Sequence, residues 1–349
     1  MTKVFKMDKD AVDVSLIPQF ILNTGDRIPA IGMGTFGSDR YSGEVIAESV
    51  RGGLRVGYRL IDCAQVYANE HLIGAVLAEA FEEGLDRSEM FVMSKVWNNN
   101  HSPEKVLESC QQSIEDLKCE YLDGYFVHWP FRNHHESFAD IDDRDENSKP
   151  YSHNEFMETW RAMEDLVEKG LVRNIGVSNV TIPKLKLILR DAKIIPAMNE
   201  MELHPCFQQG ELFQYSLDNG ILPIGYAPLG SPNRPARDKT EDDYSDWDHP
   251  IMQELAKKYS VHPSAICLKW AVKRGQVPIP LSSTRKNYLA NLKAIVEDPL
   301  TAREYSSIRS VERNSRLIKG HVFLWKGALD WEDLWDIDGT IPGWNGYEK

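Results

Sequence analysis

Short apolar runs alternate with longer segments of helical pattern along nearly the whole chain, and this alternation restricts the fold more than any other feature. In the segment 103–118, apolar side chains recur on one helical face behind Pro103, a residue that suits a first helical turn. Strands separated by helix-length segments form parallel sheets with crossover helices. We expect eight strands, at residues 30–34, 58–62, 90–94, 124–128, 173–177, 197–203, 222–226 and 277–281.

Eight such units favour an α/β fold of the closed (β/α)₈ barrel type, the TIM barrel. The barrel is expected over about residues 19–318 of a single domain spanning 1–349, with a tail over about 319–349. Periodicity alone leaves a doubly wound open sheet as an alternative. The first strand-to-helix turn has no GxGxxG, which an open dinucleotide-binding sheet usually carries there, and this favours the barrel.

Two segments stand outside the repeat. The polar and acidic stretch 132–153 is expected to be a long loop on the carboxyl-terminal face of the barrel. The tail is rich in aromatic residues, and two interpretations stay open: it packs against the barrel, or it covers the mouth of the active site. These aromatic residues are Phe323, Trp325, Trp331, Trp335 and Trp344.

Charge and cysteine content exclude several classes of protein. The net charge of −13 disfavours a nucleic-acid binder, which needs a concentrated basic surface. The five cysteines are widely spaced and form no CxxC pair, so we expect free, buried thiols and neither a disulfide framework nor a bound metal. We find no apolar signal-peptide core and no run of 18 apolar residues. We therefore expect a cytoplasmic protein with no membrane contact.

Three ionisable residues end the second, third and fourth expected strands: Asp62, Lys95 and His128. Tyr67 follows in the loop after Asp62. Each residue alone has an ordinary structural explanation, but in a barrel the carboxyl ends of the strands gather at one face, so the four side chains are expected to meet.

This set suits the reduction of a carbonyl group. Hydride addition builds negative charge on the carbonyl oxygen, which must then be protonated. A tyrosine is a weak acid with a reference pKa of about 10, and a nearby lysine cation lowers that pKa. We expect Asp62 to hold Lys95, and His128 to orient the carbonyl or share the proton relay.

Four successive segments resemble signatures of the aldo-keto reductase superfamily, and the resemblance runs from about residue 19 to the tail. The segments are GYRLIDCAQVYANE, FVMSKVW, LDGYFVHWP and GLVRNIGVSN. The resemblance implies a (β/α)₈ barrel that reduces aldehydes or ketones with NADPH or NADH and without a metal. It also implies a catalytic tetrad of Asp62, Tyr67, Lys95 and His128, with Tyr67 as the proton donor.

Further positions carry over from the family one by one. The resemblance assigns Phe36, Trp97 and Trp129 to the substrate pocket. It assigns cofactor contacts to Thr35, Ser178, Asn179, Glu200, Tyr226, Leu229, Ser231, Ser282, Thr284 and Asn291. Glu200 stands where the family has a glutamine that binds the nicotinamide carboxamide. As a carboxylate it can accept from the amide but cannot donate, and it adds negative charge near the nicotinamide; the alternative is a purely structural substitution.

The segment IPLSSTRKN departs from members that prefer NADPH. Leu281 and Asn287 replace a lysine and an arginine that grip the 2′-phosphate, and Asn233 replaces an aspartate that pairs with the lysine. Arg285 and Lys286 either compensate or face solvent. We expect the protein to accept NADH.

We expect a small carbonyl compound as the substrate, but the sequence restricts its chemical class less than it restricts the reaction. His134, His135 and the acidic loop favour a sugar or other polar aldehyde, whereas the aromatic tail favours an apolar one.

Two other functions are compatible with a barrel: a cofactor-binding regulatory subunit, and a lyase with a Schiff base on Lys95. The intact tetrad opposes the first, and Asp62 opposes the second because it keeps Lys95 charged. A monomer is expected.

Overall fold

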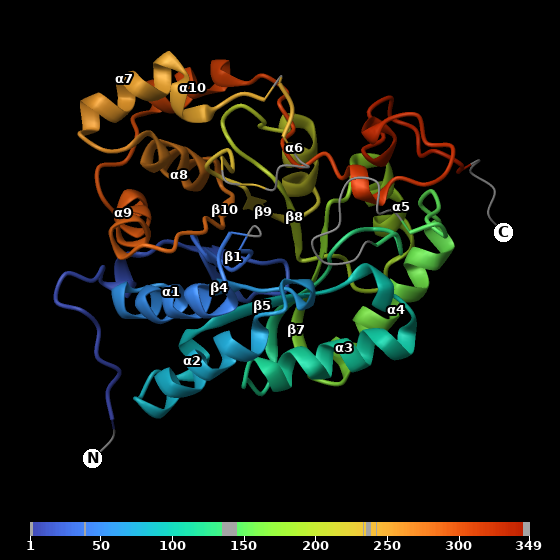
Figure 1. Ribbon diagram of the computed structural model, residues 1–349, viewed down its shortest axis with the longest axis horizontal. Helices are drawn as coiled ribbons and strands as arrows, with labels where there is room; N and C mark the ends of the chain where they lie inside the picture. Colours follow the sequence, from blue (N-terminus) through green and yellow to red (C-terminus); the bar gives the residue numbers. More distant parts are fainter. Residues whose placement is uncertain are drawn as a thin grey trace.

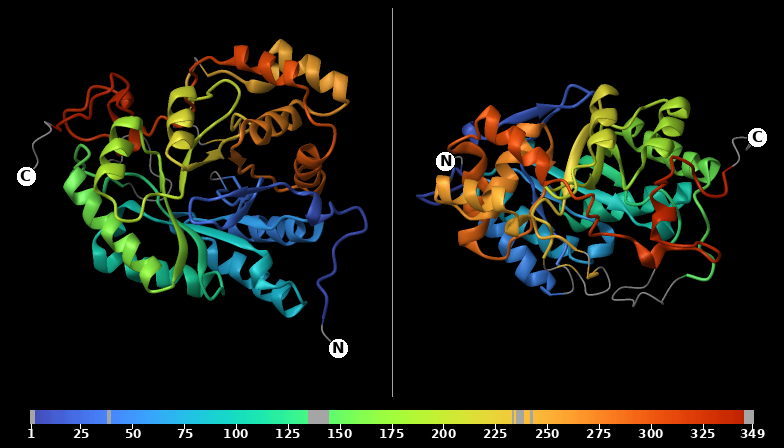
Figure 2. Two further views of the ribbon diagram at one scale, coloured as in Figure 1. Left: turned by 180° about the vertical axis from the view of Figure 1, so that it is seen from behind. Right: turned by 90° about the horizontal axis from the view of Figure 1, so that it is seen from above.

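A sheet of eight parallel strands forms the centre of the molecule, and helices surround it (Figures 1 and 2). The computed structural model describes residues 3–37, 40–134, 145–232, 234, 239–241 and 243–344. Each of the eight expected runs contains or overlaps one observed strand. The strands are β3 (Met33–Gly34), β4 (Leu60–Asp62), β5 (Phe91–Val96), β6 (Leu122–Val127), β7 (Val172–Ser178), β8 (Met198–Glu202), β9 (Leu222–Tyr226) and β10 (Val277–Pro278).

The order of the strands decides between the two expected sheet types. From β3 to β10 each strand pairs in parallel with the next strand along the chain. A doubly wound sheet instead reverses its order at a switch point. The backbone N–H groups of Gly32 and Gly34 donate to the carbonyls of Pro278 and Pro280, at 3.0 and 3.2 Å. These two bonds join the first and last strand regions, as a (β/α)₈ barrel requires.

The helices cover the outside of the sheet (Figure 1). In α1, for example, Ile46, Val50 and Leu54 recur every four residues and are buried, so one face packs on the strands. Proline occupies the first turn of α3, α5, α7 and α8. The ten helices of the described chain are α1 (Gly43–Val56), α2 (Glu70–Glu82), α3 (Pro103–Asp116), α4 (His153–Glu168), α5 (Ile182–Asp191), α6 (Gly210–Asp218), α7 (Pro250–Tyr259), α8 (Pro263–Arg274), α9 (Arg285–Val296) and α10 (Ala302–Ile308).

A hairpin that the strand pattern did not predict closes one end of the barrel. Strands β1 (Gln19–Ile21) and β2 (Arg27–Pro29) pair antiparallel. Leu22 and Ile28 from this hairpin pack with Leu60, Phe91 and Val277, the first residues of β4, β5 and β10. The hairpin therefore plugs the amino-terminal ends of the strands, and an open site remains possible only at their carboxyl ends.

The carboxyl-terminal tail packs on the barrel, as the first interpretation expected, and it also borders the open end of the barrel. Phe323 lies 4.5 Å from Trp129, measured between ring centroids, and also lines the cavity described below. Trp335 lies 5.5 Å from Trp129 in the same way. In Figure 1 the tail, drawn in red, lies beside α5.

The remaining expectations about the chain concern its thiols, its long loop and membranes. All five cysteines are buried with free thiols, as expected. Of the loop 132–153, residues 135–144, His135 among them, lie outside the described part of the chain. Among the described helices, none combines the length and the apolarity needed to cross a bilayer.

Candidate active site

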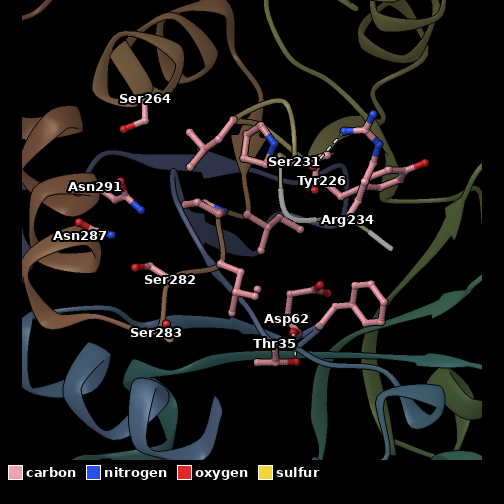
Figure 3. A pocket seen from close by; sticks show the side chains of 18 of the residues that line it. Thr35, Asp62, Tyr226, Ser231, Arg234, Ser264, Ser282, Ser283, Asn287 and Asn291 are labelled. Atoms are coloured by element: carbon pink, nitrogen blue, oxygen red, sulfur yellow. Dashed lines mark hydrogen bonds between the residues drawn. The ribbon is translucent and has the colours of Figure 1, made fainter. Parts of the chain in front are cut away.

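A cavity of about 1320 Å³ opens at the carboxyl ends of the strands. Figure 3 shows it with Thr35 and Asp62 on one side, and with Ser264, Asn287 and Asn291 of helices α8 and α9 on the other. All residues that the family resemblance assigned to catalytic, cofactor or substrate contacts line this cavity, except Lys95. Lys95 is fully buried below the cavity surface.

Lys95 is held by oxygens from three sides. Its Nζ lies 2.5 Å from Oδ1 of Asp62, and it also donates to the carbonyl of Cys63 at 3.0 Å. Oε1 of Glu200 approaches the same nitrogen at 3.3 Å. Burial alone lowers the pKa of Lys95, but the two carboxylates outweigh burial and raise it well above its ordinary value. Lys95 is therefore a permanent cation.

Tyr67 ends a short 3₁₀ turn (Gln65–Tyr67), and its ring centroid lies 5.4 Å from Nζ of Lys95. Lys95 lowers the pKa of this phenol, as expected, but it does not determine the net direction. Burial raises the pKa of Tyr67, and the Lys95 cation offsets only part of that rise. Tyr67 is thus fully protonated at neutral pH, with a cation beside it that stabilises the phenolate once the proton has left.

His128 completes the tetrad at the end of β6. Its ring stands edge-on to Tyr67, at 5.8 Å between centroids, and lies 5.1 Å from the Trp97 ring. Burial, together with the Lys95 cation, lowers the pKa of His128 well below its ordinary value. Within the described chain its buried Nδ1 has no hydrogen-bond partner. A neutral imidazole orients a ligand by hydrogen bonding and does not supply a proton.

The neighbouring polar residues fix the strand ends to one another. The Thr35 hydroxyl donates to the carbonyl of Asp62 at 2.7 Å. The Asn179 amide donates to the carbonyl of His128 at 2.9 Å, and its Oδ1 accepts from the Tyr226 hydroxyl at 2.7 Å. Asn179 adopts a left-handed backbone conformation, with φ of +59°, which asparagine tolerates better than most residues. These bonds fix the ends of β4 and β6, which carry Asp62 and His128.

The chain matches the sequence model of the aldo/keto reductase family over residues 30–313. An aldo/keto reductase of Synechocystis sp. is 35% identical to it over 326 residues, which are 93% of this chain and 98% of the relative. The glycerol 2-dehydrogenase (NADP(+)) of Hypocrea jecorina is 39% identical over 84% of this chain and 92% of its own. The chain belongs to the aldo/keto reductase family.

Solved structures agree with this assignment. An aldo-keto reductase of Bombyx mori in complex with NADP superposes with a TM-score of 0.76 at 30% identity, covering 86% of this chain and 95% of that one. This aldo/keto reductase is accordingly an NAD(P)H-dependent oxidoreductase that reduces carbonyl compounds, with NADPH or NADH as cofactor. The alternatives of a regulatory subunit or a lyase are not favoured.

The end of the cavity away from Tyr67 is polar. Of the two cations that could contact a 2′-phosphate, Arg285 and Lys286, only Lys286 lines this end. Ser282, Asn287 and Asn291 line it as well. Arg285 does not: it turns outwards. Its guanidinium pairs with Asp8 at 2.8 Å and with Asp10 at 2.5 Å, both in the segment before the barrel. Asn233 lies outside the described residues.

Sequence reasoning missed part of the cavity wall. Val66, Ile318 and Val322 line the end that holds Tyr67, and Lys269 from α8 lines the polar end. The aromatic residues of the tail indicate a packing or covering function, whereas no sequence pattern indicates that its aliphatic residues line the cavity. Lys269 faces the cavity because of where α8 packs, and no local pattern encodes that position.

The cavity fits a dinucleotide. Its volume exceeds the range of about 300–1,000 Å³ that is typical of sites for drug-sized ligands. In the described part of the chain, two of its buried polar atoms, Nδ1 of His128 and Oε2 of Glu200, have no protein partner. Buried polar atoms are rarely left unpaired, so a ligand with polar groups is expected beside them.

Proposed function

We propose that Tyr67 protonates the carbonyl oxygen of the substrate while His128 orients it. The supporting observation is the position of the Lys95 cation, 5.4 Å from the Tyr67 ring and 2.5 Å from Asp62. An alkoxide is a stronger base than a phenolate, so a protonated tyrosine gives up its proton once hydride has arrived. The phenolate that remains is stabilised by Lys95, and Asp62 keeps Lys95 in place.

The cofactor supplies the hydride when bound. We propose that it lies along the cavity, with its nicotinamide end at Thr35, Ser178, Asn179, Glu200 and Tyr226. Leu229 and Ser231 border the middle of the cavity. Its adenosine end then meets Ser282, Thr284 and Asn291. This arrangement puts the reactive end next to Tyr67, which is the order that direct hydride transfer needs.

The substrate end of the cavity is apolar. Phe36, Trp97, Trp129, Val322 and Phe323 line it. His134, on which the expectation of a sugar rested, does not line this cavity and instead approaches Asp145 at 3.5 Å. We therefore propose an aldehyde or ketone with an apolar substituent as the preferred substrate, in place of a sugar.

We further propose that the enzyme acts as a monomer of one domain in the cytoplasm and accepts NADH as well as NADPH. Leu281 and Asn287 offer no charge to a 2′-phosphate, and Arg285 is neutralised by Asp8 and Asp10. Lys286 remains as the cation nearest to Asn287 in the sequence. Lys269 also lines this end, but its Nζ is already bound to the carbonyls of Ala294 and Asp298. The loss of the two cations at positions 281 and 287 supports a weak preference between the two cofactors.

The test is steady-state reduction of apolar aldehydes and sugars by the wild type and by Tyr67→Phe. Loss of the phenol proton should lower kcat by about 10²- to 10⁴-fold while cofactor binding is kept. The matched control is Tyr125→Phe, which removes another buried hydroxyl, one that lies outside the cavity. Wild-type-like turnover by Tyr67→Phe would refute the assigned proton donor.

A further inference from the structure

Two carboxylates compete for a single buried cation. Asp62, Lys95 and Glu200 are exposed by only 4%, 0% and 2%. If all three were ionised, the cluster would carry one excess negative charge in a medium of low dielectric constant, which is costly. One of the two acids therefore holds a proton, and geometry indicates which. Asp62 is the closer partner of Lys95, at 2.5 Å, and Glu200 is the more distant one, at 3.3 Å.

The second oxygen of Glu200 points to the same conclusion. In the described part of the structure, Oε2 is buried and has no hydrogen-bond partner, although the residue lines the cavity. Burial and the charge of Asp62 raise the pKa of Glu200 to about 8, against the opposing effect of Lys95. Glu200 is thus a neutral acid near pH 7, with a free O–H group at the edge of the cavity.

Glu200 also lies close to where the redox reaction takes place. Lys95 is adjacent both to Glu200 and to Tyr67. If Tyr67 protonates the carbonyl oxygen, the nicotinamide ring that delivers hydride to the same carbonyl lies next to this cluster. That ring is neutral when reduced and carries one positive charge when oxidised. A carboxylate a few ångströms away therefore distinguishes the two states electrostatically.

We propose that Glu200 is a redox-linked proton site, protonated beside the reduced cofactor and ionised beside the oxidised one. The proton balance closes over a catalytic cycle. The alcohol product takes hydride from the cofactor and one proton through Tyr67. Glu200 releases its own proton to solvent as the ring becomes positive and regains one when a reduced cofactor replaces the oxidised one. This inference rests on the role proposed for Tyr67, because that role positions the ring.

Apart from Asp62, the titratable groups around Glu200 have pKa values shifted away from the range in which Glu200 titrates. The pKa values of Lys95 on β5, of Tyr67, and of Tyr226 on β9 are raised, the two tyrosines by burial and Lys95 by its carboxylate partners. That of His128 is lowered well below its ordinary value by burial. Glu202, on the same strand, is bound to His204 at 3.1 Å, and its pKa is lowered. Asp62 shares Lys95 with Glu200, so the two acids titrate as a pair.

The test is the pH dependence of binding, measured by fluorescence titration with NADP⁺ and with NADPH from about pH 6.5 to about pH 9.5. The Kd for NADP⁺ should fall as pH rises, by at most about tenfold per pH unit, and the Kd for NADPH should change much less. The 2′-phosphate titrates in both cofactors, so its effect cancels in the ratio of the two Kd values. Glu200→Gln keeps the shape of the side chain and should make this ratio independent of pH.

The matched control is Glu70→Gln. Glu70 is another buried carboxylate, bound to Ser94 at 2.5 Å and Ser113 at 3.0 Å, but it does not line the cavity. This variant should keep the pH dependence of the wild type. As a second measurement, calorimetry of NADP⁺ binding near pH 7 in two buffers of different ionisation enthalpy should detect proton release in the wild type and none in Glu200→Gln.

An unchanged pH dependence in a folded Glu200→Gln variant would overturn the inference. The result is separable from the proposal for Tyr67. Tyr67→Phe lacks the proton donor but keeps Glu200, so it should keep the linkage in binding while it loses turnover. If it turned over normally, the assignment of Tyr67 would fail. If Tyr67→Phe lost turnover and the wild type showed no pH dependence in the ratio of its two Kd values, the inference about Glu200 would fail and the assignment of Tyr67 would stand.

Discussion

Nζ of Lys184 lies 2.6 Å from Oδ2 of Asp336, and both side chains are buried. The same nitrogen donates to the carbonyl of Leu334 at 3.2 Å, and the Thr181 hydroxyl donates to the same carboxylate. Lys184 and Thr181 belong to α5 and its amino-terminal cap, whereas Asp336 belongs to the tail. This pair fastens the tail to the barrel beside Trp335, which packs on Trp129 in the wall of the cavity.

Breaking this pair should loosen the tail and weaken substrate binding. Lys184→Met leaves Asp336 buried without its cation, and removing one partner of such a pair typically costs about 3–5 kcal/mol. We expect a raised KM for apolar aldehydes, an unchanged Kd for the cofactor and faster hydrogen exchange in residues 317–344. Lys186→Met, also on α5, is the control, because Lys186 lies over the Tyr215 ring and makes no bond to the described part of the tail. Unchanged KM and exchange in Lys184→Met would contradict the assigned function of the pair.

Loss of Lys95 should cost more stability than loss of either of its acidic partners. Lys95→Met leaves the Asp62 carboxylate, with Glu200 beside it, buried without a cation, and we expect the free energy of unfolding to fall by about 3–5 kcal/mol, in addition to the loss of activity. Asp62→Asn should be milder, because removal of the Asp62 charge lets Glu200 ionise and neutralise Lys95. Denaturant unfolding of both variants measures the difference. Equal destabilisation by the two variants would show that Glu200 does not act as a second counter-ion.

Cofactor preference should respond to one residue at the polar end of the cavity. Leu281→Lys returns a cation to a 2′-phosphate, and one charged hydrogen bond contributes about 1.5–3 kcal/mol. We expect kcat/KM for NADPH to rise by about 10- to 100-fold and that for NADH to change little. In the wild type the two values should lie within about tenfold of each other, so a thousandfold preference for NADPH would refute the proposed tolerance of NADH.

Asp8 and Asp10 should influence the same preference from outside the barrel. Replacing both by asparagine removes the charges that neutralise Arg285. We expect the released cation to strengthen the positive potential at the start of α9 and to lower the KM for NADPH but not that for NADH. The effect should fade in high salt, because these groups are exposed. Asp13→Asn, close in sequence but not bonded to Arg285, is the control.

His204 should make the fold less stable in alkaline solution. Burial lowers the pKa of His204, but Asp246 and Glu202 outweigh burial and raise it to about 10. A raised pKa contributes stability below the pKa of about 6.5 in the unfolded chain, and this contribution is lost as pH rises towards about 10. The free energy of unfolding should therefore fall across this range by a few kcal/mol. His204→Gln should be less stable but should show a flatter dependence, and an equally steep one would exclude His204 as the cause.

The sequence predicted the parts of the site that local pattern encodes. Asp62, Lys95 and His128 stand at strand ends, and parallel pairing in chain order brings strand ends together, so their meeting followed from periodicity alone. The partners of Arg285 could not be foreseen, because Asp8 and Asp10 lie more than 270 residues away in the sequence and contact it only in the folded state. The sequence did not predict that the pKa of Tyr67 is raised overall, for a similar reason. Proximity to Lys95 can be inferred from a motif, whereas the cost of burial depends on everything packed around the phenol.

The two hydrogen bonds that join the first and last strand regions, Gly32 to Pro278 and Gly34 to Pro280, affect how the protein folds during synthesis. Both accepting carbonyls belong to prolines, which have no N–H to donate in return. These two prolines lie near the end of the barrel sequence. A chain leaving the ribosome exposes its first strand long before the last one exists. The ring cannot close, and the wall formed by Leu281, Asn287 and Asn291 cannot be assembled, until almost the whole polypeptide has emerged. During synthesis the first half therefore exists as an open sheet edge that must be kept from pairing with other chains.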